Sequence, residues 1–267
     1  MQNLKDKKIV ITGATGGIGY ELVKLLVSEG ADLFLISSNA EKLKKLKDEL
    51  ENKESSISFA TFDLTKIEGI KDAASVLSDL DYVDILINMS GISYFGSFGL
   101  QEFSEIEKLY NINLLAPTVL TQSVLPEMIV RNSGQIVNIG SIFGSISFPY
   151  FTTYSASKAG LRSFSEALRR ELYETNIKVS YLAPRAVKTQ INEGKVAEFL
   201  EKSKTAIDDA NQVAQKILND IKQQKKNSYF GFPEKFFVRL NYLIPSLVDN
   251  ALQKQAQIAR EILTNND

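Results

Sequence analysis

The chain has 267 residues and a formal net charge of −1, which excludes a strongly basic surface for nucleic acid. Its hydrophobic fraction of 44% and charged fraction of 24% are typical of a globular protein. The absence of cysteine and histidine excludes disulfides, thiolate nucleophiles and the usual zinc and iron ligands, so no metal site is predicted. A polar start and the lack of a long apolar run favour a cytoplasmic protein without a signal peptide or membrane span.

The first predicted unit is a strand over residues 8–12, a turn that reads GATGGIG over residues 13–19, and an amphipathic helix that ends near Gly30. Glycines let a backbone approach a pyrophosphate, and the free N–H groups of a helix N-terminus attract anions. The turn therefore favours dinucleotide binding over a simple tight turn. Its predicted cofactor contacts are Gly13, Thr15, Gly17, Ile18 and Gly19.

The second strand, over residues 31–37, bears on the choice of cofactor, and a surface helix over residues 40–52 follows it. An acidic residue at the tip of this strand would bind the adenosine ribose 2′-hydroxyl and select NAD. The tip reads Ser37-Ser38-Asn39, so hydroxyls are available for a 2′-phosphate and nothing repels it. NADP(H) is therefore favoured, with NAD(H) as the alternative.

Further apolar runs and amphipathic segments alternate along the chain. Strands are predicted over residues 57–62, 82–88, 135–139, 177–182 and 228–230, and helical segments over 103–131, 154–175 and 208–224. This alternation predicts one α/β domain over residues 1–231, built on a doubly wound parallel sheet of about seven strands with helices on both faces.

Polar residues follow several of these strands, at the edge of the sheet where such folds bind ligands. Asp63 is predicted to accept a hydrogen bond from an adenine amino group, to cap a helix that starts near Lys66, or to do both. Asn113 lies among apolar neighbours and is either a satisfied core asparagine or a functional one. The further predicted cofactor contacts are Leu64, Asn88, Gly91, Pro184, Val187 and Thr189.

Tyr154 and Lys158 are one helical turn apart, so their side chains share one face. An ammonium beside the phenol in a partly dry site is expected to lower the tyrosine pKa and make Tyr154 a general acid or base. Ser141 follows a strand and could polarise a carbonyl oxygen. Taken alone, such a pair is more often a solvated lysine over a half-buried ring.

Together these segments resemble the short-chain dehydrogenase/reductase family over about residues 5–230. The cofactor turn, Asp63, the segment Asn88-Met89-Ser90-Gly91 and the thirteen-residue step from Ser141 to Tyr154 carry the resemblance. The resemblance implies a Rossmann-type fold and a catalytic tetrad of Asn113, Ser141, Tyr154 and Lys158. It also implies that Tyr154 and Lys158 contact the cofactor.

In the mechanism that the resemblance implies, Tyr154 exchanges a proton with the substrate oxygen while hydride moves between substrate carbon and nicotinamide. Lys158 binds the nicotinamide ribose, Ser141 positions the oxygen and Asn113 holds a water. The expected activity is oxidoreduction of a carbonyl or secondary alcohol. A non-catalytic NAD(P)-sensing module is the alternative, and an epimerase or dehydratase has little room for its larger substrate domain.

One departure from the family pattern is Arg185, which stands where the family usually has glycine. It is expected either to contact a cofactor phosphate or substrate acid, or to turn to solvent. The predicted substrate contacts are aromatic, namely Tyr94, Phe143 and Phe148, and residues 190–205 are expected to form a lid. They favour a hydrophobic ketone or alcohol, such as a fatty-acyl or lipid-like compound.

Residues 232–267 form an extension beyond the family core, with an apolar helical stripe interrupted at Pro245 and a basic approach. Two alternatives stay open: a helix packed on its own domain or a partner subunit, and an amphipathic segment that touches a membrane or admits a lipid-like substrate. The family precedent implies a homodimer or homotetramer.

Overall fold

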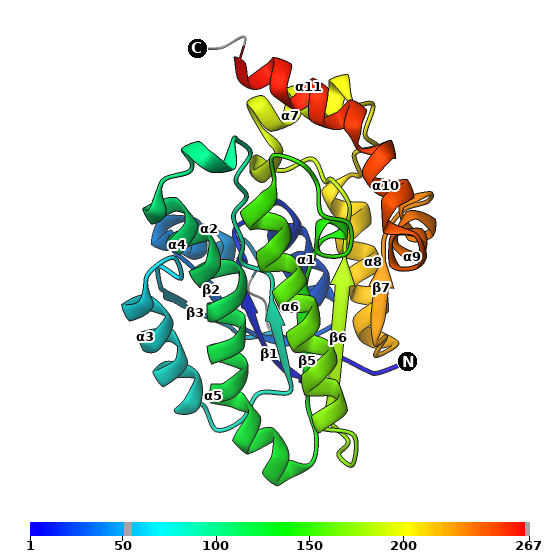
Figure 1. Ribbon diagram of the computed structural model, residues 1–267. Coiled ribbons are helices and arrows are strands. Elements are labelled where there is room, and N and C mark those ends of the chain that lie inside the picture. Colours follow the sequence, from blue (N-terminus) through cyan, green and yellow to red (C-terminus); the bar gives the residue numbers. More distant parts are fainter. Residues whose placement is uncertain (51–54, 265–267) are drawn as a thin grey trace.

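A computed structural model describes residues 1–50 and 55–264. Its centre is a parallel sheet in the order β3-β2-β1-β4-β5-β6-β7, which confirms the predicted doubly wound, Rossmann-type fold (Figure 1). The strands are β1 (Lys8–Thr12), β2 (Asp32–Ser37), β3 (Ile57–Thr61), β4 (Ile85–Asn88), β5 (Gln135–Ile139), β6 (Lys178–Ala183) and β7 (Asn227–Tyr229).

Helices cover both faces of the sheet, with α1, α2 and α8 on one face and α3, α5 and α6 on the other. Their bounds are α1 (Gly17–Ser28), α2 (Ala40–Leu50), α3 (Ile67–Ser78), α4 (Phe103–Tyr110), α5 (Ala116–Arg131), α6 (Thr152–Glu171) and α8 (Ala210–Lys222). The remaining helices gather near the carboxyl ends of the strands: α7 (Lys195–Lys202), α9 (Glu234–Leu243), α10 (Pro245–Ala251) and α11 (Gln253–Thr264).

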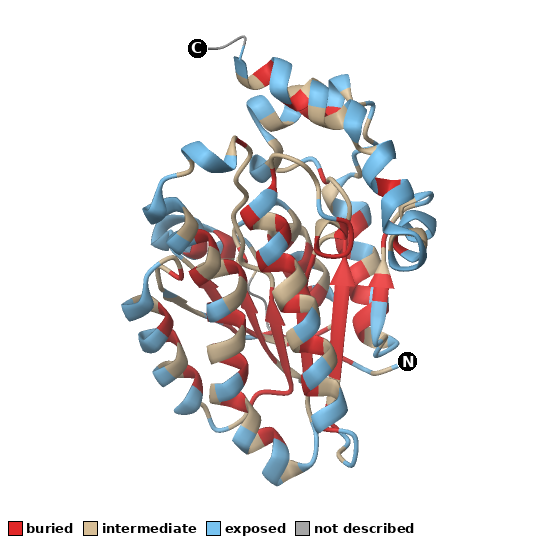
Figure 2. Cartoon of the chain, in the orientation of Figure 1, coloured by how far each residue is buried: buried red, intermediate tan, exposed pale blue. Residues whose placement is uncertain are grey.

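The alternation of side chains along each strand divides the core into two layers. Ile9 and Ile11 of β1 pack with α1 and α8, whereas Val10 between them packs with α3 and α5. Helices cover both faces of the strands, so nearly all strand residues are buried (Figure 2). This explains why the strand sequences are continuous apolar runs rather than alternating ones. This packing fixes the positions of the strand ends, and the polar residues of the candidate site follow directly after them.

Some element boundaries differ from those predicted. β4 begins at Ile85 rather than at residue 82, because the carboxylate of Asp84 accepts a hydrogen bond from the Lys8 backbone N–H at 3.0 Å. α6 begins at Thr152, one half-turn before Tyr154. α2 is described to Leu50, and the predicted helix residues 51–52 lie outside the described residues.

The C-terminal extension packs over the carboxyl ends of the strands. Ala259 and Ile262 of α11 contact the buried face of α7, and Val238 and Val248 join Ile142 in a second small cluster. As predicted, the chain breaks at Pro245, where α9 gives way to α10. Throughout residues 1–50 and 55–264, no helix combines the length and the apolarity needed to cross a membrane.

Candidate active site

The glycine-rich turn after β1 is shaped by close backbone contacts. Gly13 has φ +72°, and a Cβ there would lie 2.9 Å from the backbone nitrogen of Ser90. A Cβ on Gly19 would lie 2.1 Å from the carbonyl oxygen of Gly13, and one on Gly17 would lie 2.6 Å from Thr189. The turn therefore brings β1, the segment after β4 and the segment after β6 together.

The N-terminus of α1 opens toward this turn. Gly16 is its N-cap, and within the described part of the chain no side chain caps the helix or places an acid in its first turn. Its first N–H groups are therefore available to an anion, and the helix dipole favours one. This arrangement fits the pyrophosphate of a dinucleotide.

The tip of β2 carries hydroxyls and no acid. Thr15 and Ser37 are joined by a hydrogen bond of 2.6 Å between their hydroxyl oxygens, while Ser38 is exposed. The side chain of Asn39 is occupied, because its Oδ1 accepts a hydrogen bond from the Lys42 N–H at 2.8 Å. Ser38 therefore offers the free hydroxyl at this position.

Asp63 does not cap a helix, so that part of the prediction is wrong. Its carboxylate accepts hydrogen bonds from the Thr65 hydroxyl at 2.6 Å and the Thr65 N–H at 3.1 Å, while α3 starts only at Ile67 after an N-cap at Lys66. The hydrogen bond from the Thr65 hydroxyl is the largest cause that lowers the pKa of Asp63. The side chain stays 43% exposed, so it is an ionised acceptor at the sheet edge. The adjacent Leu64 is buried.

The side chain of Asn88, one of the predicted cofactor contacts, points into the core. This amide is buried and donates to Oδ1 of Asn138 at 2.9 Å, and to the Thr121 hydroxyl of α5 at 3.3 Å. Asn138 in turn donates to Ser165 of α6. Asn88 therefore ties β4 to β5 and α5 rather than facing a ligand.

Gly91, Asn113 and Lys158 meet at one point. A Cβ on Gly91 would lie 2.9 Å from Oδ1 of Asn113 and 3.3 Å from Nζ of Lys158. Asn113 is fully buried, and its amide exchanges two hydrogen bonds with the backbone of Ile92, at 2.9 and 3.0 Å, and donates to Ser157 at 3.1 Å. Both predictions for Asn113 are thus compatible, since it is a satisfied core amide that touches the lysine site.

Asn113 lies on a π-helix, Asn111–Leu115, between α4 and α5. Such segments insert one residue into a helical run and are frequent at functional sites. The insertion is what presents a polar side chain from the helix to the segment after β4. Sequence periodicity gave no signal for it.

Tyr154 and Lys158 lie in the first turns of α6, where Lys158 is buried and Tyr154 is half-buried in the wall of a cavity. Burial lowers the pKa of Lys158 to about 8, and its Nζ donates to the carbonyl of Ile139 at 3.2 Å. Burial raises the pKa of Tyr154, and a hydrogen bond with Ser141 opposes this rise. The expectation that Lys158 lowers the tyrosine pKa is wrong for this arrangement, in which the ammonium is bound to a carbonyl of β5.

Tyr181, which sequence analysis did not single out, holds the serine segment. Its hydroxyl donates to the carbonyl of Ser141 at 3.2 Å and accepts from the Ser141 N–H at 3.4 Å. Its ring occupies the space beside Gly140, where a Cβ would lie 2.2 Å from ring atoms. Tyr181 is completely buried, which raises its pKa and keeps the phenol neutral.

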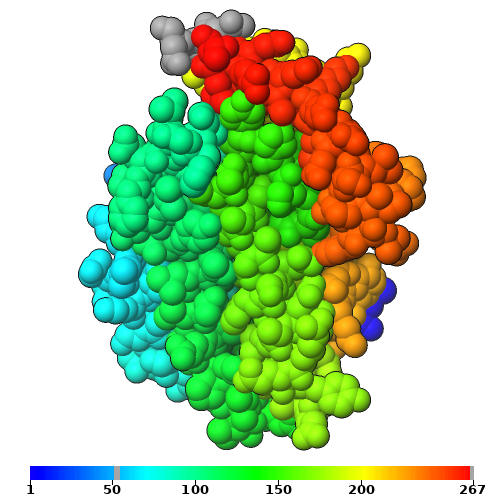
Figure 3. Space-filling view, viewed as in Figure 1, coloured from blue at the N-terminus to red at the C-terminus, as the bar shows by residue number. Residues whose placement is uncertain are grey.

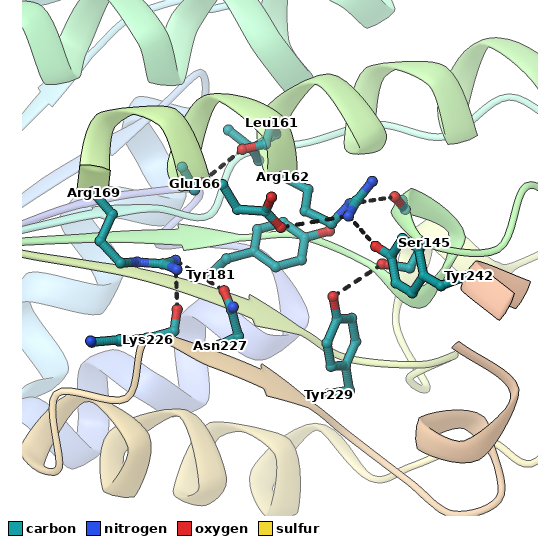
Figure 4. A network of polar contacts seen from close by, with 12 residues as sticks. Ser145, Leu161, Arg162, Glu166, Arg169, Tyr181, Lys226, Asn227, Tyr229 and Tyr242 are labelled. Carbon is teal, nitrogen blue, oxygen red and sulfur yellow. Dashed lines mark hydrogen bonds and ion pairs between the residues drawn. The ribbon is translucent and has the colours of Figure 1, made fainter. Parts of the chain in front are cut away.

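A second set of contacts links the turn after Ser141 to the C-terminal extension (Figure 4). Arg162 of α6 donates to the carbonyl of Gly144 at 3.1 Å and to the hydroxyl of Tyr242 in α9. Ser145 donates to the Tyr229 hydroxyl at 3.3 Å, and its carbonyl accepts from Asn241 at 2.9 Å. The extension therefore supports the turn that carries the candidate serine.

A cavity of about 430 Å³ lies against Ser141, Tyr154 and Lys158. Phe143 and Phe148 line it and stack on each other at 4.3 Å between ring centroids. Tyr94, the third predicted substrate contact, is not among the residues that line this cavity and packs over Gly96. The cofactor-side residues in its wall are Ile18, Gly91, Pro184, Val187 and Thr189.

The C-terminal extension supplies a further part of the cavity wall, although none of its residues was among the predicted substrate contacts. Its lining residues are Pro233, Glu234, Phe237, Val248, Ala251, Leu252 and Gln255. Residues of the predicted lid, among them Ile191, Val196 and Leu200, complete the wall. The apolar stripe of the extension is visible in the sequence, but a stripe does not reveal which other segment it packs against. Its place in the cavity wall could therefore not be predicted.

Arg185 does not turn to solvent, so that alternative is wrong, and its side chain pairs with two acids beside the cavity. Its guanidinium donates to both carboxylate oxygens of Asp208, at 2.7 and 3.0 Å, and to Glu234 at 3.2 Å. These acids raise its pKa, the hydrogen bond to Asp208 being the largest cause. Arg185 therefore joins the segment after β6 to α8 and α9, and its charge is neutralised.

Comparisons with known proteins agree with this geometry. Residues 7–199 match the family model described as short chain dehydrogenase. The chain is 33% identical to Dehydrogenase/reductase SDR family member 7B of Mus musculus over 270 residues, covering 97% of this chain and 84% of that protein.

Two solved structures show the same fold. A short-chain dehydrogenase from Sphingobium yanoikuyae in complex with NADPH has a TM-score of 0.78 at 24% identity, covering 93% of this chain and 95% of that one. A short-chain dehydrogenase/reductase from Burkholderia phymatum in complex with NAD has a TM-score of 0.82 at 22% identity, covering 92% and 96%. With the family match over most of its length, this chain belongs to the short-chain dehydrogenase family and is an NAD(P)-dependent oxidoreductase.

Proposed function

We propose that the protein reduces a bulky, hydrophobic ketone to a secondary alcohol with NADPH. The observation that carries this proposal is the cavity of about 430 Å³, which places apolar and aromatic walls against Ser141 and Tyr154. The part of this cavity beside the cofactor-side residues would hold the nicotinamide, and the apolar and aromatic remainder suits a largely apolar ligand, whose orientation a few polar groups set.

The residues that would hold the cofactor form one continuous edge of the sheet. The open N-terminus of α1 suits the pyrophosphate, Asp63 suits the adenine amino group, and Lys158 suits the nicotinamide ribose. Ser38 supports NADPH, because its exposed hydroxyl can donate to a 2′-phosphate where an acid would repel one. When bound, the cofactor supplies the hydride.

The protein's part in this reaction is proton transfer and orientation. Burial raises the pKa of Tyr154, so at neutral pH it is a neutral phenol that can donate its proton to a carbonyl oxygen. Ser141, held in place by Tyr181, can donate a second hydrogen bond to the same oxygen.

Gln255 suggests a second polar group on the substrate. Its Oε1 is buried in the cavity region and accepts no hydrogen bond from the described residues. A buried unpaired acceptor is costly, so a ligand with a hydroxyl or N–H group there would be favoured over a purely apolar one. The proposed substrate class is therefore a bulky hydrophobic ketone with one remote hydrogen-bond donor.

Titration with NADPH and NADH, followed by nicotinamide fluorescence, tests the cofactor part. NADPH oxidation with ketones of increasing bulk then tests the substrate part. The Tyr154→Phe variant is expected to bind NADPH unchanged and to lose turnover by about 100-fold or more. Binding of neither nucleotide, or turnover that survives this substitution, would refute the proposal and favour a non-catalytic module.

A further inference from the structure

Much of α9 and α10 is exposed at one side of the molecule (Figure 2), and several of the exposed residues are large and apolar. Phe232 is 81% exposed, Leu243 79% and Phe236 56%, although each is a large apolar residue. The set that forms this surface, called here the α9–α10 surface, is Phe232, Phe236, Phe237, Leu243, Ile244 and Leu247. Single exposed apolar residues are ordinary, but a contiguous group marks an interaction site.

These side chains face outward because the opposite sides of the two helices are already occupied. Val238 of α9 and Val248 of α10 are buried against Ile142 and Ile146, beside the turn that carries Ser141. Tyr242 further fixes α9 to that turn through its contact with Arg162 (Figure 4), and Asn241 donates a hydrogen bond to the carbonyl of Ser145. The α9–α10 surface therefore belongs to a helix pair that is already folded onto its own domain.

The exposed charges of α9 are positive, while the adjoining α10 carries one exposed acid, Asp249. α9 contains a single acid, Glu234, which is bound to Arg185, whereas Lys235 and Arg239 are exposed and make no ion pair among the described residues. The two cations are four positions apart, on one side of the helix. An apolar stripe flanked by free cations is the pattern of a helix that lies in a membrane interface.

The same charges disfavour a second copy of the chain as the occupant. A two-fold interface centred on α9 would bring Lys235 and Arg239 toward their own counterparts, with no unpaired acid on α9 and a single exposed acid, Asp249, on α10 to offset the two cations. Like charges facing each other in an interface are costly. An anionic phospholipid bilayer suits both features, because its headgroups can pair with the cations and its acyl boundary can take up the apolar stripe.

The α9–α10 surface is continuous with the cavity wall. Phe237 is part of both, and Pro233, Val248 and Leu252 line the cavity from the same helices. In the space-filling view the orange and red segment from α9 to α11 forms an unbroken strip along one side and over the top of the molecule (Figure 3). A bilayer bound to this strip would bring its apolar acyl chains next to the cavity.

We propose that the α9–α10 surface docks the protein on the surface of an anionic phospholipid bilayer. Phe232, Phe236 and Leu243 enter the headgroup–acyl boundary, and Lys235 and Arg239 pair with the anionic headgroups. The docking does not depend on the substrate or on catalysis, so it is tested separately from the proposed reaction.

The chain contains no tryptophan, so a single introduced tryptophan reports on its own surroundings. The Phe236→Trp variant of the full chain is mixed with vesicles of phosphatidylcholine and phosphatidylserine. Its emission is expected to shift to shorter wavelength and to be quenched when the lipids carry bromine on their acyl chains. The matched control is Val130→Trp, at an 86% exposed position on α5, which is expected to show neither change.

Vesicle sedimentation measures the two contributions. Lys235→Gln with Arg239→Gln is expected to weaken binding to the anionic vesicles by about 30-fold, since each cation contributes about a factor of five near an anionic surface. Phe236→Ser with Leu243→Ser is expected to weaken it by about 100-fold. Val130→Ser is the control, and unchanged NADPH binding shows that each variant is folded.

Three results would overturn the docking proposal. The first is equal bromine quenching of the Phe236→Trp and Val130→Trp variants. The second is binding to anionic vesicles that the Lys235→Gln and Arg239→Gln substitutions leave unchanged. The third is a mass, measured by light scattering without lipid, that falls to the monomer in the Phe236→Ser and Leu243→Ser variant. That last result would assign the α9–α10 surface to a second copy of the chain.

Discussion

The guanidinium of Arg185 holds the carboxylate of Glu234 at 3.2 Å, and so ties the segment after β6 to the first turn of α9. Both side chains are largely shielded from solvent, and both line the cavity. Each therefore belongs to the wall of the site and to the attachment of the extension. The pairs with Asp208 and Glu234 neutralise a cation that would otherwise face an apolar ligand.

The Glu234→Gln variant is expected to lower the free energy of unfolding by about 1 kcal/mol, because Asp208 still satisfies part of the guanidinium. It is also expected to raise KM for a bulky ketone several-fold while leaving NADPH affinity unchanged. Urea unfolding and steady-state kinetics measure the two effects. Glu29→Gln is the matched control, since it opens the similarly shielded pair with Lys222 away from the cavity. An equal KM change in both variants would contradict this role.

Ser38→Asp tests the cofactor preference at the tip of β2. A carboxylate there would repel a 2′-phosphate and accept hydrogen bonds from the ribose hydroxyls. The ratio of NADPH to NADH affinity is expected to fall by about 10-fold or more, as measured by fluorescence titration. Ser38→Asn adds similar bulk without charge and is expected to keep the preference. If the ratio does not move, the 2′-phosphate lies elsewhere.

Gly140→Ala is expected to damage both stability and turnover, because its Cβ would lie 2.2 Å from the ring of Tyr181. Overpacking of this kind costs about 1–3 kcal/mol, and any shift of the ring moves the backbone of Ser141. Gly99→Ala is the control, since a Cβ there meets nothing within 4 Å. Thermal unfolding and kcat are compared, and a Gly140→Ala variant with normal kcat would show that Tyr181 does not position the serine.

Lys158 gives the apoprotein a pH-dependent stability. Burial lowers its pKa from 10.5 to about 8, so between these values the unfolded chain binds a proton that the folded chain does not. The free energy of unfolding therefore rises with pH. Lys158 contributes about 2 kcal/mol to this rise between about pH 7 and 9.5.

The Lys158→Met variant is expected to lose this rise, and urea unfolding at several pH values measures it. The matched control is Lys71→Met, at an exposed position on α3, which is expected to follow the wild-type curve. Parallel curves for wild type and Lys158→Met would mean that the ammonium is well solvated in the folded protein.

The fold could be predicted because each strand is a local apolar run and each connection is short. The glycine turn could also be predicted, since Gly13, Gly17 and Gly19 act within a few residues of one another. The directions of side chains at strand ends could not. Asn88 turns into the core because Asn138, fifty positions away, offers it an acceptor.

The same limit applies to Arg185, whose partners lie 23 and 49 positions further along the chain. The sequence around an arginine does not show whether its guanidinium contacts a ligand or pairs with acids that are distant in the chain. The pKa of Tyr154 depends on where the ammonium of Lys158 points, and helical spacing alone does not determine this. The π-helix was missed because one inserted residue barely disturbs an apolar pattern.

That π-helix, Asn111–Leu115, has a consequence for how relatives of this chain are compared. Deleting any one of its residues would restore a regular α-helix and rotate everything on one side of the deletion by about 100° relative to the other. A different side chain would then face Gly91, and the amide of Asn113 would leave Ile92 and Ser157. At this point of the chain the number of residues matters as much as their identity, and an alignment gap placed one turn away would pair Asn113 with the wrong residue.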